Sequence, residues 1–205
     1  MKKTLSYILA IVVCLATLCG CGDTPSGGQT TDGPRDSVML RNALGMQTTD
    51  PADTNETDVL TVNEQIYEGL YTLDESGGGY QPCLAKQIDI SDDATVYTIT
   101  LQDGVKFHNG ETLKASDVVF SYQHFMDNPK YNSYTDMIEK VEASDDSHVV
   151  ITIARPYSPI LHTFFKIKIL SEKEVTSQGS DFGTIANLAG TGPYYMDAET
   201  YRPNS

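Results

Sequence analysis

The chain has 205 residues, of which 40% are hydrophobic and 20% charged, and this composition is typical of a globular protein rather than a disordered one. Lys and Arg number 14 against 28 Asp and Glu, which gives a net charge of -14. A surface this acidic repels phosphate backbones, so we expect no nucleic-acid partner.

The N-terminus has the pattern of an export signal. Lys2 and Lys3 precede an apolar run over residues 5–18, which is shorter than the ~20 apolar residues that a membrane-spanning helix needs. The run ends at Leu18-Cys19-Gly20-Cys21, which resembles the lipobox of bacterial lipoproteins. That resemblance implies a signal peptide over residues 1–20 and a lipid on Cys21. The alternative is a plain signal peptide with an incidental cysteine.

Residues 21–36 predict a flexible tether, because the stretch GDTPSGGQTTDGP after Cys21 holds too little apolar surface to fold. Once the signal is removed and Cys21 carries lipid, Cys83 is the one cysteine left in the exported domain. We therefore expect neither an internal disulfide nor a cysteine-based metal site.

The first elements after the tether are a strand and a helix. Residues 37–43 are rich in apolar side chains and suit a buried strand, which the pair Asp50-Pro51 would end. Four apolar residues at helical spacing predict the helix, namely Val59, Val62, Ile66 and Leu70. Asn55 or Thr57 could cap its start and Gly69 its end.

Turns and hairpins follow in the sequence pattern. Three consecutive glycines within residues 72–80 predict the tip of a hairpin or of a loop. Apolar and polar residues alternate over residues 95–101, which we pair with residues 87–90 across a turn. A second such hairpin pairs residues 139–143 with residues 148–153.

Helices are predicted between and after these hairpins. One begins at Ala115 or Ser116 and runs to Phe125. The pair Ser158-Pro159 predicts a capped helix start before Ile160, and residues 171–174 have the spacing of a capping box.

A search for catalytic and metal-binding motifs returns none that carries chemistry. The four histidines, at positions 108, 124, 148 and 162, lack the close spacing of a metal site, and no nucleophile elbow, P-loop or dinucleotide fingerprint is present. We therefore expect no enzymatic activity, no metal and no cofactor.

Longer blocks of sequence carry a resemblance to a known family. Over residues 37–195 the chain is similar to the extracytoplasmic solute-binding proteins of family 5, the oligopeptide- and dipeptide-binding receptors of ABC importers. The matching motifs are Asp50-Pro51, Tyr67-Glu68-Gly69-Leu70, Pro82-Cys83-Leu84-Ala85, the block GVKFHNGETLKASDVVF over residues 104–120, and Gly190-Thr191-Gly192-Pro193-Tyr194.

The resemblance implies an α/β fold of the type II periplasmic-binding-protein kind. It assigns residues 37–68 to a first-lobe segment, residues 69–165 to an appended small α+β domain, and residues 166–205 to the return into the first lobe. Family members are commonly more than twice this long, and their second lobe follows the motif at residues 190–194. We therefore expect these 205 residues to hold part of lobe one with its appended domain, truncated before the second lobe.

The function implied is that of a receptor that captures oligopeptides, or another family solute such as a nickel chelate, haem or an oligosaccharide. It would deliver them to an ABC permease with its ATPase subunits. The protein would be lipid-anchored at the extracytoplasmic face of the cell membrane, in the periplasm or on the cell surface, and would touch the membrane through the lipid alone. The alternative is a lipid-anchored surface module for adhesion or signalling, without transport.

Four residues are candidates for contact with the solute. In the peptide-binding members, the loop five to seven residues after the Asp-Pro pair lines the cleft, which implies Asn55, Glu56 and Thr57 here. The same residues also suit a helix N-cap with an acidic first turn. Tyr131 resembles the aromatic residue that these receptors turn toward solute, and the alternative is a loop tyrosine that packs on its own domain.

Overall fold

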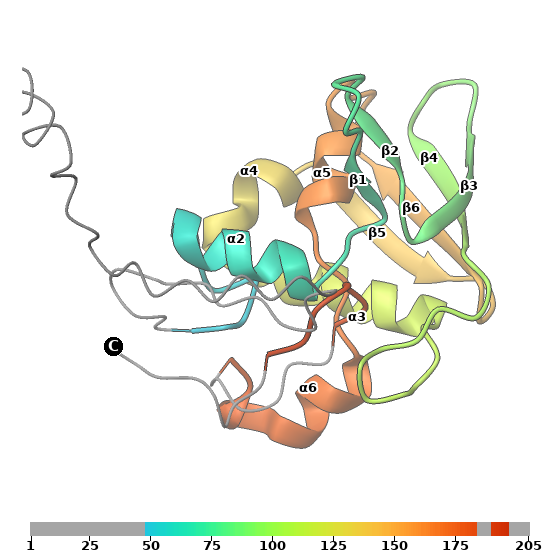
Figure 1. Cartoon of the computed structure of the whole chain (residues 1–205). Coiled ribbons are helices and arrows are strands. Elements are labelled where there is room, and N and C mark those ends of the chain that lie inside the picture. The colour runs from blue at the N-terminus through green and yellow to red at the C-terminus, as the bar shows by residue number, and fades with distance from the viewer. Residues whose placement is uncertain (1–47, 184–189, 197–205) are drawn as a thin grey trace, which may run out of the picture. The chain divides into compact units, whose positions relative to one another are not determined.

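The computed structural model describes residues 48–183 and 190–196 (Figure 1). The expected signal peptide, Cys21, the tether and the strand at residues 37–43 lie outside the described residues. Within the described ranges, no helix is both long enough and apolar enough to cross a bilayer.

The main sheet has four antiparallel strands in the order β3-β4-β6-β5. Their bounds are Ala85–Ile90 for β3, Val96–Leu101 for β4, Ile138–Ala143 for β5 and His148–Ile153 for β6. β4 and β6 form the centre, and every second residue of each is buried, so that Ile99 and Ile151 both reach zero exposure. Both hairpins predicted for this sheet are therefore confirmed.

A separate two-stranded hairpin, β1 (Tyr71–Leu73) with β2 (Tyr80–Pro82), also confirms its prediction. Its tip is closed by Asp74, whose carboxylate accepts from the Ser76 N–H and whose backbone N–H donates to Gly79. The exposed glycines therefore form part of the turn between β1 and β2.

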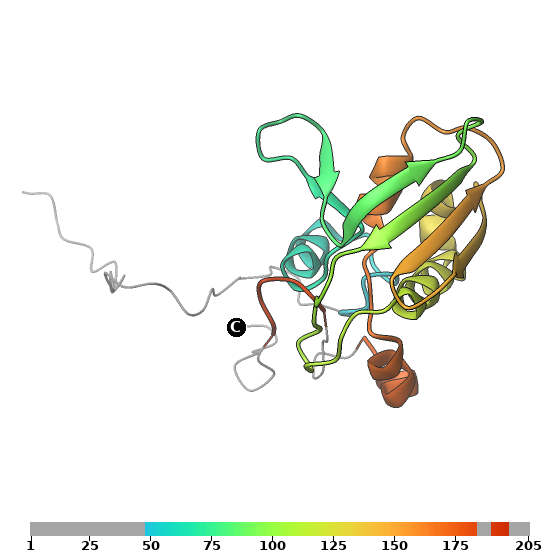
Figure 2. The same ribbon diagram turned by 90° about the vertical axis from the view of Figure 1, so that its right-hand side faces the viewer.

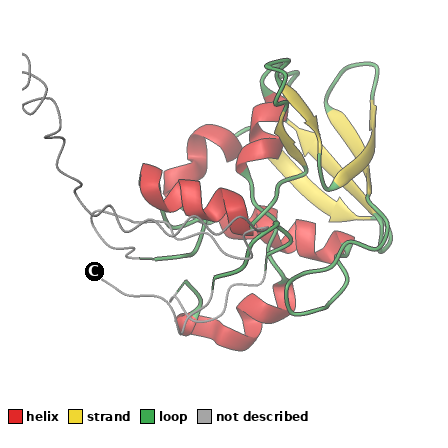
Figure 3. Ribbon diagram, viewed as in Figure 1, coloured by secondary structure: helices red, strands yellow, loops and turns green. Residues whose placement is uncertain are grey.

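One face of the main sheet is covered by helices, while the other faces away from them (Figures 2 and 3). The covering elements are α3 (Ala115–Met126), the 3-10 turn η1 (Pro129–Tyr131), α4 (Asn132–Thr135) and α5 (Ile160–Lys166). Tyr122, Phe125 and Phe164 from these helices belong to one core with the inward-facing sheet residues. α3 matches its predicted bounds to within one residue.

Three local predictions were wrong. The helix α2 (Thr57–Ile66) ends before Gly69, because Tyr67 has extended backbone angles. Pro159 rather than Ser158 occupies the N-cap of α5 and makes no side-chain cap bond. Residues 105–107, whose apolar residues between two turn dipeptides predict a short strand, contribute a single bridge between Lys106 and Thr112.

The last described helix is α6 (Glu172–Gln178), followed by η2 (Gly179–Asp181). The Ser171 hydroxyl accepts from the Glu174 N–H, as its capping-box position predicted. Buried Ser121 ties α3 to the chain just before α6, since its Oγ accepts from the Leu170 N–H at 2.8 Å and donates to the Asp117 carbonyl at 2.6 Å.

The chain enters and leaves the sheet-containing part side by side. Gly69 and Lys168 form an antiparallel bridge, and the Ile169 N–H donates to the Glu68 carbonyl at 2.8 Å. These entry and exit segments lie where the family resemblance puts the boundaries of the appended domain. The division into lobe and appended domain itself stays a prediction.

Candidate functional site

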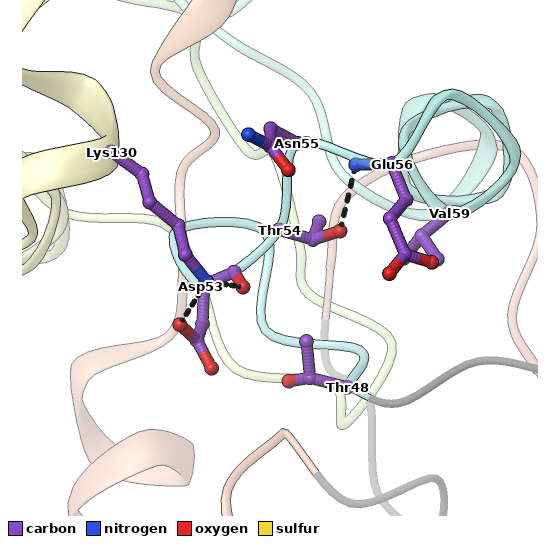
Figure 4. A pocket seen from close by; sticks show the side chains of 7 residues that line it. All are labelled: Thr48, Asp53, Thr54, Asn55, Glu56, Val59 and Lys130. Carbon is purple, nitrogen blue, oxygen red and sulfur yellow. Dashed lines mark hydrogen bonds and ion pairs between the residues drawn. The ribbon is translucent and has the colours of Figure 1, made fainter.

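A small pocket lies where the Asp-Pro segment leads into α2 (Figure 4). Its volume is about 180 Å³, and its lining is mostly polar. The residues that line it are Thr48, Asp53, Thr54, Asn55, Glu56, Val59 and Lys130. Two of the four predicted solute-contacting residues, Asn55 and Glu56, are therefore brought together here. Thr57, the first residue of α2, is exposed next to them but does not line the pocket.

The shape of the loop begins with two local turns. The Asp50 carboxylate accepts from the Ala52 N–H at 2.8 Å, and the Thr54 hydroxyl oxygen accepts from the Glu56 N–H at 3.2 Å. These side chains bond nearby backbone in place of a cap on the helix. The N-cap of α2 is therefore Glu56, without a side-chain cap bond, and the prediction of Asn55 or Thr57 as the cap was wrong.

Asn55 presents unpaired backbone on the pocket wall. Neither its N–H nor its C=O forms a hydrogen bond with any other described residue, while the Glu56 carbonyl is used by the Leu60 N–H. Exposed backbone groups that lack partners can pair with the main chain of an extended ligand.

The lining is completed by Lys130, which follows Asp53 by 77 positions in the chain. The Lys130 ammonium lies 2.7 Å from the Asp53 carboxylate and 2.6 Å from the Asp53 carbonyl oxygen. The hydrogen bond from Lys130 lowers the pKa of Asp53 below its ordinary value, so this carboxylate is charged near neutral pH. Figure 4 shows Lys130 reaching across to Asp53.

Tyr131 lies behind the loop and does not line the pocket. Its side chain is 6% exposed, and its hydroxyl donates to the Pro51 carbonyl at 2.6 Å and lies 3.2 Å from the Thr54 carbonyl. Burial raises the pKa of Tyr131 to about 12, so the hydroxyl remains a donor. The ring packs edge-on against Phe125 with centroids 4.6 Å apart. Direct contact between Tyr131 and solute stays a prediction.

Sequence reasoning did not connect His124 with this region. Its Nε2 lies 2.8 Å from an Asp50 carboxylate oxygen, and its ring stacks on Phe120 and meets Phe182 edge-on. Neither the residue spacing nor the composition of the sequence indicates that Asp50 and His124 lie together, because only folding brings them into contact. Lys130 and Asp53 were also missed, although each is a close sequence neighbour of a predicted site residue.

The Gly190–Tyr194 motif packs against the other end of α2. The Gly192 N–H donates to the Ile66 carbonyl at 2.9 Å, and the Tyr194 N–H donates to the Gln65 carbonyl at 3.1 Å. A Cβ at Gly190 would lie 1.9 Å from the Ile66 carbonyl oxygen. Glycine therefore permits an approach that satisfies the last carbonyls of the helix.

A second, more open groove of about 870 Å³ runs between α6 and the start of α3. Its lysines are already paired, Lys114 with Asp146 and Lys173 with Glu111. Across the described ranges, no three His, Cys, Asp or Glu side chains converge as a metal site would require.

Comparisons with known proteins agree on one family. The profile of the bacterial extracellular solute-binding proteins, family 5, matches residues 79–205. The glutathione-binding protein GsiB of Salmonella typhi is 33% identical over 167 residues, which cover 78% of this chain and 32% of GsiB.

Solved structures give the same result. OppA from Listeria monocytogenes, solved bound to peptide, superposes with a TM-score of 0.66 at 28% identity and covers 71% of this chain and 33% of its own. NikZ from Campylobacter jejuni, in complex with Ni(L-His), gives a TM-score of 0.62 at 34% identity and covers 72% of this chain and 30% of its own.

The chain spans about a third of the length of these relatives. The described residues form part of the type II periplasmic-binding-protein fold, which confirms the fold class expected from the sequence. Because the family profile matches more than half of its residues, the chain belongs to the bacterial extracellular solute-binding proteins of family 5.

Proposed function

We propose that the full-length protein is the solute-binding receptor of an ABC importer, which captures oligopeptides outside the membrane and delivers them to the permease with its ATPase subunits. Family membership together with the pocket beside Asn55 carries this proposal. The peptide-bound OppA relative supports oligopeptides as the solute class, while GsiB and NikZ keep glutathione and a nickel chelate as further family solutes.

The loop formed by Asn55, Glu56 and Thr57 would contact the solute mainly through its backbone. The unpaired N–H of Asn55 would donate to the main chain of an extended peptide and its C=O would accept from it, as in an added strand. Such pairing is independent of peptide side chains, which suits a receptor for peptides of many sequences. The Glu56 carboxylate on the same wall would favour a cationic group on the solute.

The direct test is solute binding by the full-length protein. Tetra-alanine, reduced glutathione and Ni(II)-histidine are each titrated by calorimetry and by thermal shift, because a solute that binds the folded state alone raises the melting temperature. We expect tetra-alanine to bind. Amide hydrogen exchange then reports on the site, and we expect slower exchange at Asn55 when the peptide is present.

A pair of variants separates backbone from side-chain recognition. Asn55→Ala removes the side chain and keeps the N–H, so peptide affinity should change less than about threefold. Asn55→Pro removes the N–H, so affinity should fall about tenfold, the equivalent of one hydrogen bond. Binding of none of the three solutes would overturn the receptor proposal, and equal losses in both variants would overturn backbone pairing.

We also propose the extracytoplasmic face of the cell membrane as the location, with a lipid on Cys21 as the anchor. The family description supports an extracellular location. The sequence pattern around Cys21 supports the lipid.

A further inference from the structure

We propose that Lys130 and Tyr131 are positioning residues that hold the solute loop in its binding shape. Here the solute loop is residues 53–57, and the brace is the segment Asn128–Tyr131 that reaches it. The proposal rests on the function proposed above in so far as solute binds this loop. It means that the brace controls solute affinity indirectly, by holding the solute loop in place.

The first contact is made at the outer edge of the loop. The Lys130 ammonium donates to both the carboxylate and the backbone carbonyl of Asp53, at 2.7 and 2.6 Å. Asn128 Nδ2 approaches the same carboxylate at 3.5 Å. One cation thus fixes the side chain and the main chain of a residue two positions before Asn55.

The second contact is made from the inner side. The Tyr131 hydroxyl donates to the Pro51 carbonyl and lies within hydrogen-bond distance of the Thr54 carbonyl, so it spans the start of the solute loop. Both contacts of the Tyr131 hydroxyl are buried. Its removal would therefore leave the carbonyls of Pro51 and Thr54 without this partner.

The brace is itself held rigidly. Asn128 caps it by accepting from the Lys130 N–H, and Pro129 sets the backbone angle of its first position. The Tyr131 ring is seated on Phe125, which is fully buried, and the Tyr131 carbonyl accepts from the Thr135 hydroxyl. A rigid support can therefore transmit its position to the loop.

The loop has no comparable support of its own. Among the described residues, every hydrogen bond from the solute loop to a distant part of the chain goes to the brace. The others, such as the Glu56 N–H to the Thr54 hydroxyl, are local. Loss of the brace contacts should therefore loosen residues 53–57 while the sheet stays intact.

The first experiment measures amide hydrogen exchange in the solute-free, full-length protein. Tyr131→Phe removes the hydroxyl and keeps the ring, and Lys130→Met removes the charge and keeps most of the stem. Each should speed exchange at residues 55–57 about tenfold. Exchange at Ile99 and Ile151 in the sheet core should stay within twofold of the wild type.

Two matched variants serve as controls. Tyr134→Phe removes the same atom from a tyrosine whose ring packs near Tyr131 but whose hydroxyl has no bond to the loop, and Lys140→Met breaks an exposed ion pair with Glu142 on β5. Neither should alter exchange in the loop. Lys130→Arg keeps both donors to Asp53 and should restore slow exchange.

The second readout is affinity for tetra-alanine. Tyr131→Phe and Lys130→Met should each weaken tetra-alanine binding by a factor similar to the change in loop exchange. The melting temperature of each variant should stay within about 3 °C of the wild type. Unchanged loop exchange in both variants, or equally faster exchange throughout the sheet, would overturn the brace. If the wild type binds no solute, the receptor proposal fails, and the exchange experiment still decides whether the brace holds the loop.

Discussion

Gly69 shows how one residue can fix the path of the chain. A Cβ at this position would lie 2.6 Å from the Phe164 carbonyl oxygen and 2.9 Å from that of Phe165. Both neighbours are backbone atoms, which cannot move aside as a flexible side chain can. The glycine is therefore required by the close approach of the chain as it enters the sheet-containing part, and a helix cap is not its role.

Gly69→Ala should lower the free energy of unfolding by about 1–3 kcal/mol, the usual cost of forcing an added methyl group into packed surroundings. Urea denaturation followed by circular dichroism measures the loss. The control is Gly78→Ala at the exposed hairpin tip, where the nearest atom belongs to the Asp74 side chain. That change should cost less than about 0.5 kcal/mol, and equal losses at both positions would contradict the close-approach argument.

At the scale of elements, the ion pair between His124 and Asp50 connects α3 to the turn that begins the site. The pKa of His124 is raised, first by its hydrogen bond to Asp50 and further by the charges of Asp127 and Asp53. Phe120 and Phe182 complete its surroundings. The folded state therefore favours the protonated imidazole.

The sign of the pH effect follows from this shift. The stabilisation is fully present below the unfolded pKa of about 6.5 and is lost as the pH rises through the higher folded pKa. The wild type should therefore exceed His124→Gln in stability by more at pH 5.5 than at pH 8.5, as measured by urea denaturation at both values.

His162 provides a comparison of opposite sign. Its pKa is lowered, first by burial and then by Lys166, so folding favours the neutral ring. The stability difference between the wild type and His162→Gln should be larger at pH 8.5. The same pH trend in both variants would rule out the ion pair as the cause of the effect at His124.

At the scale of the whole molecule, one core links the hairpin, the sheet and the covering helices. Phe164 in α5 is fully buried. The centroid of its ring lies 6.0 Å from that of Tyr71 in β1 and 5.7 Å from that of Tyr97 in β4. Apolar residues from residue 52 to residue 169 share this cluster. The solute loop and its brace are therefore carried by a single packed body.

The charge of these 205 residues bears on the proposed place of the protein in the cell. Their net charge of -14 is repelled by an anionic membrane surface, so attachment of this part of the protein would depend on the lipid. Cys21→Ser should release the protein from the membrane fraction, and mass spectrometry of the wild-type N-terminus should find a diacylglyceryl group on Cys21. Membrane retention of Cys21→Ser would contradict the anchor, and Cys83→Ser, which leaves the lipobox intact, serves as the control.

The sequence by itself determined most of the elements and the family. Alternation over residues 95–101 predicted the central strand β4, because a half-buried strand must bury every second side chain. Capping and turn residues marked α3 and α6, since those preferences act within a few residues. The motifs that carried the family resemblance, including the block at residues 104–120, can be recognised from the order of residues alone.

Only the tertiary structure decided how the site is built. Asp53 meets Lys130, and Asp50 meets His124, across about 75 intervening residues. No local pattern encodes such pairs, because they exist only after the sheet and helices have packed and brought α3 beside the Asp-Pro turn. The place of Tyr131 behind the loop was decided in the same way, since burial of its ring against Phe125 left its hydroxyl facing the carbonyls of Pro51 and Thr54.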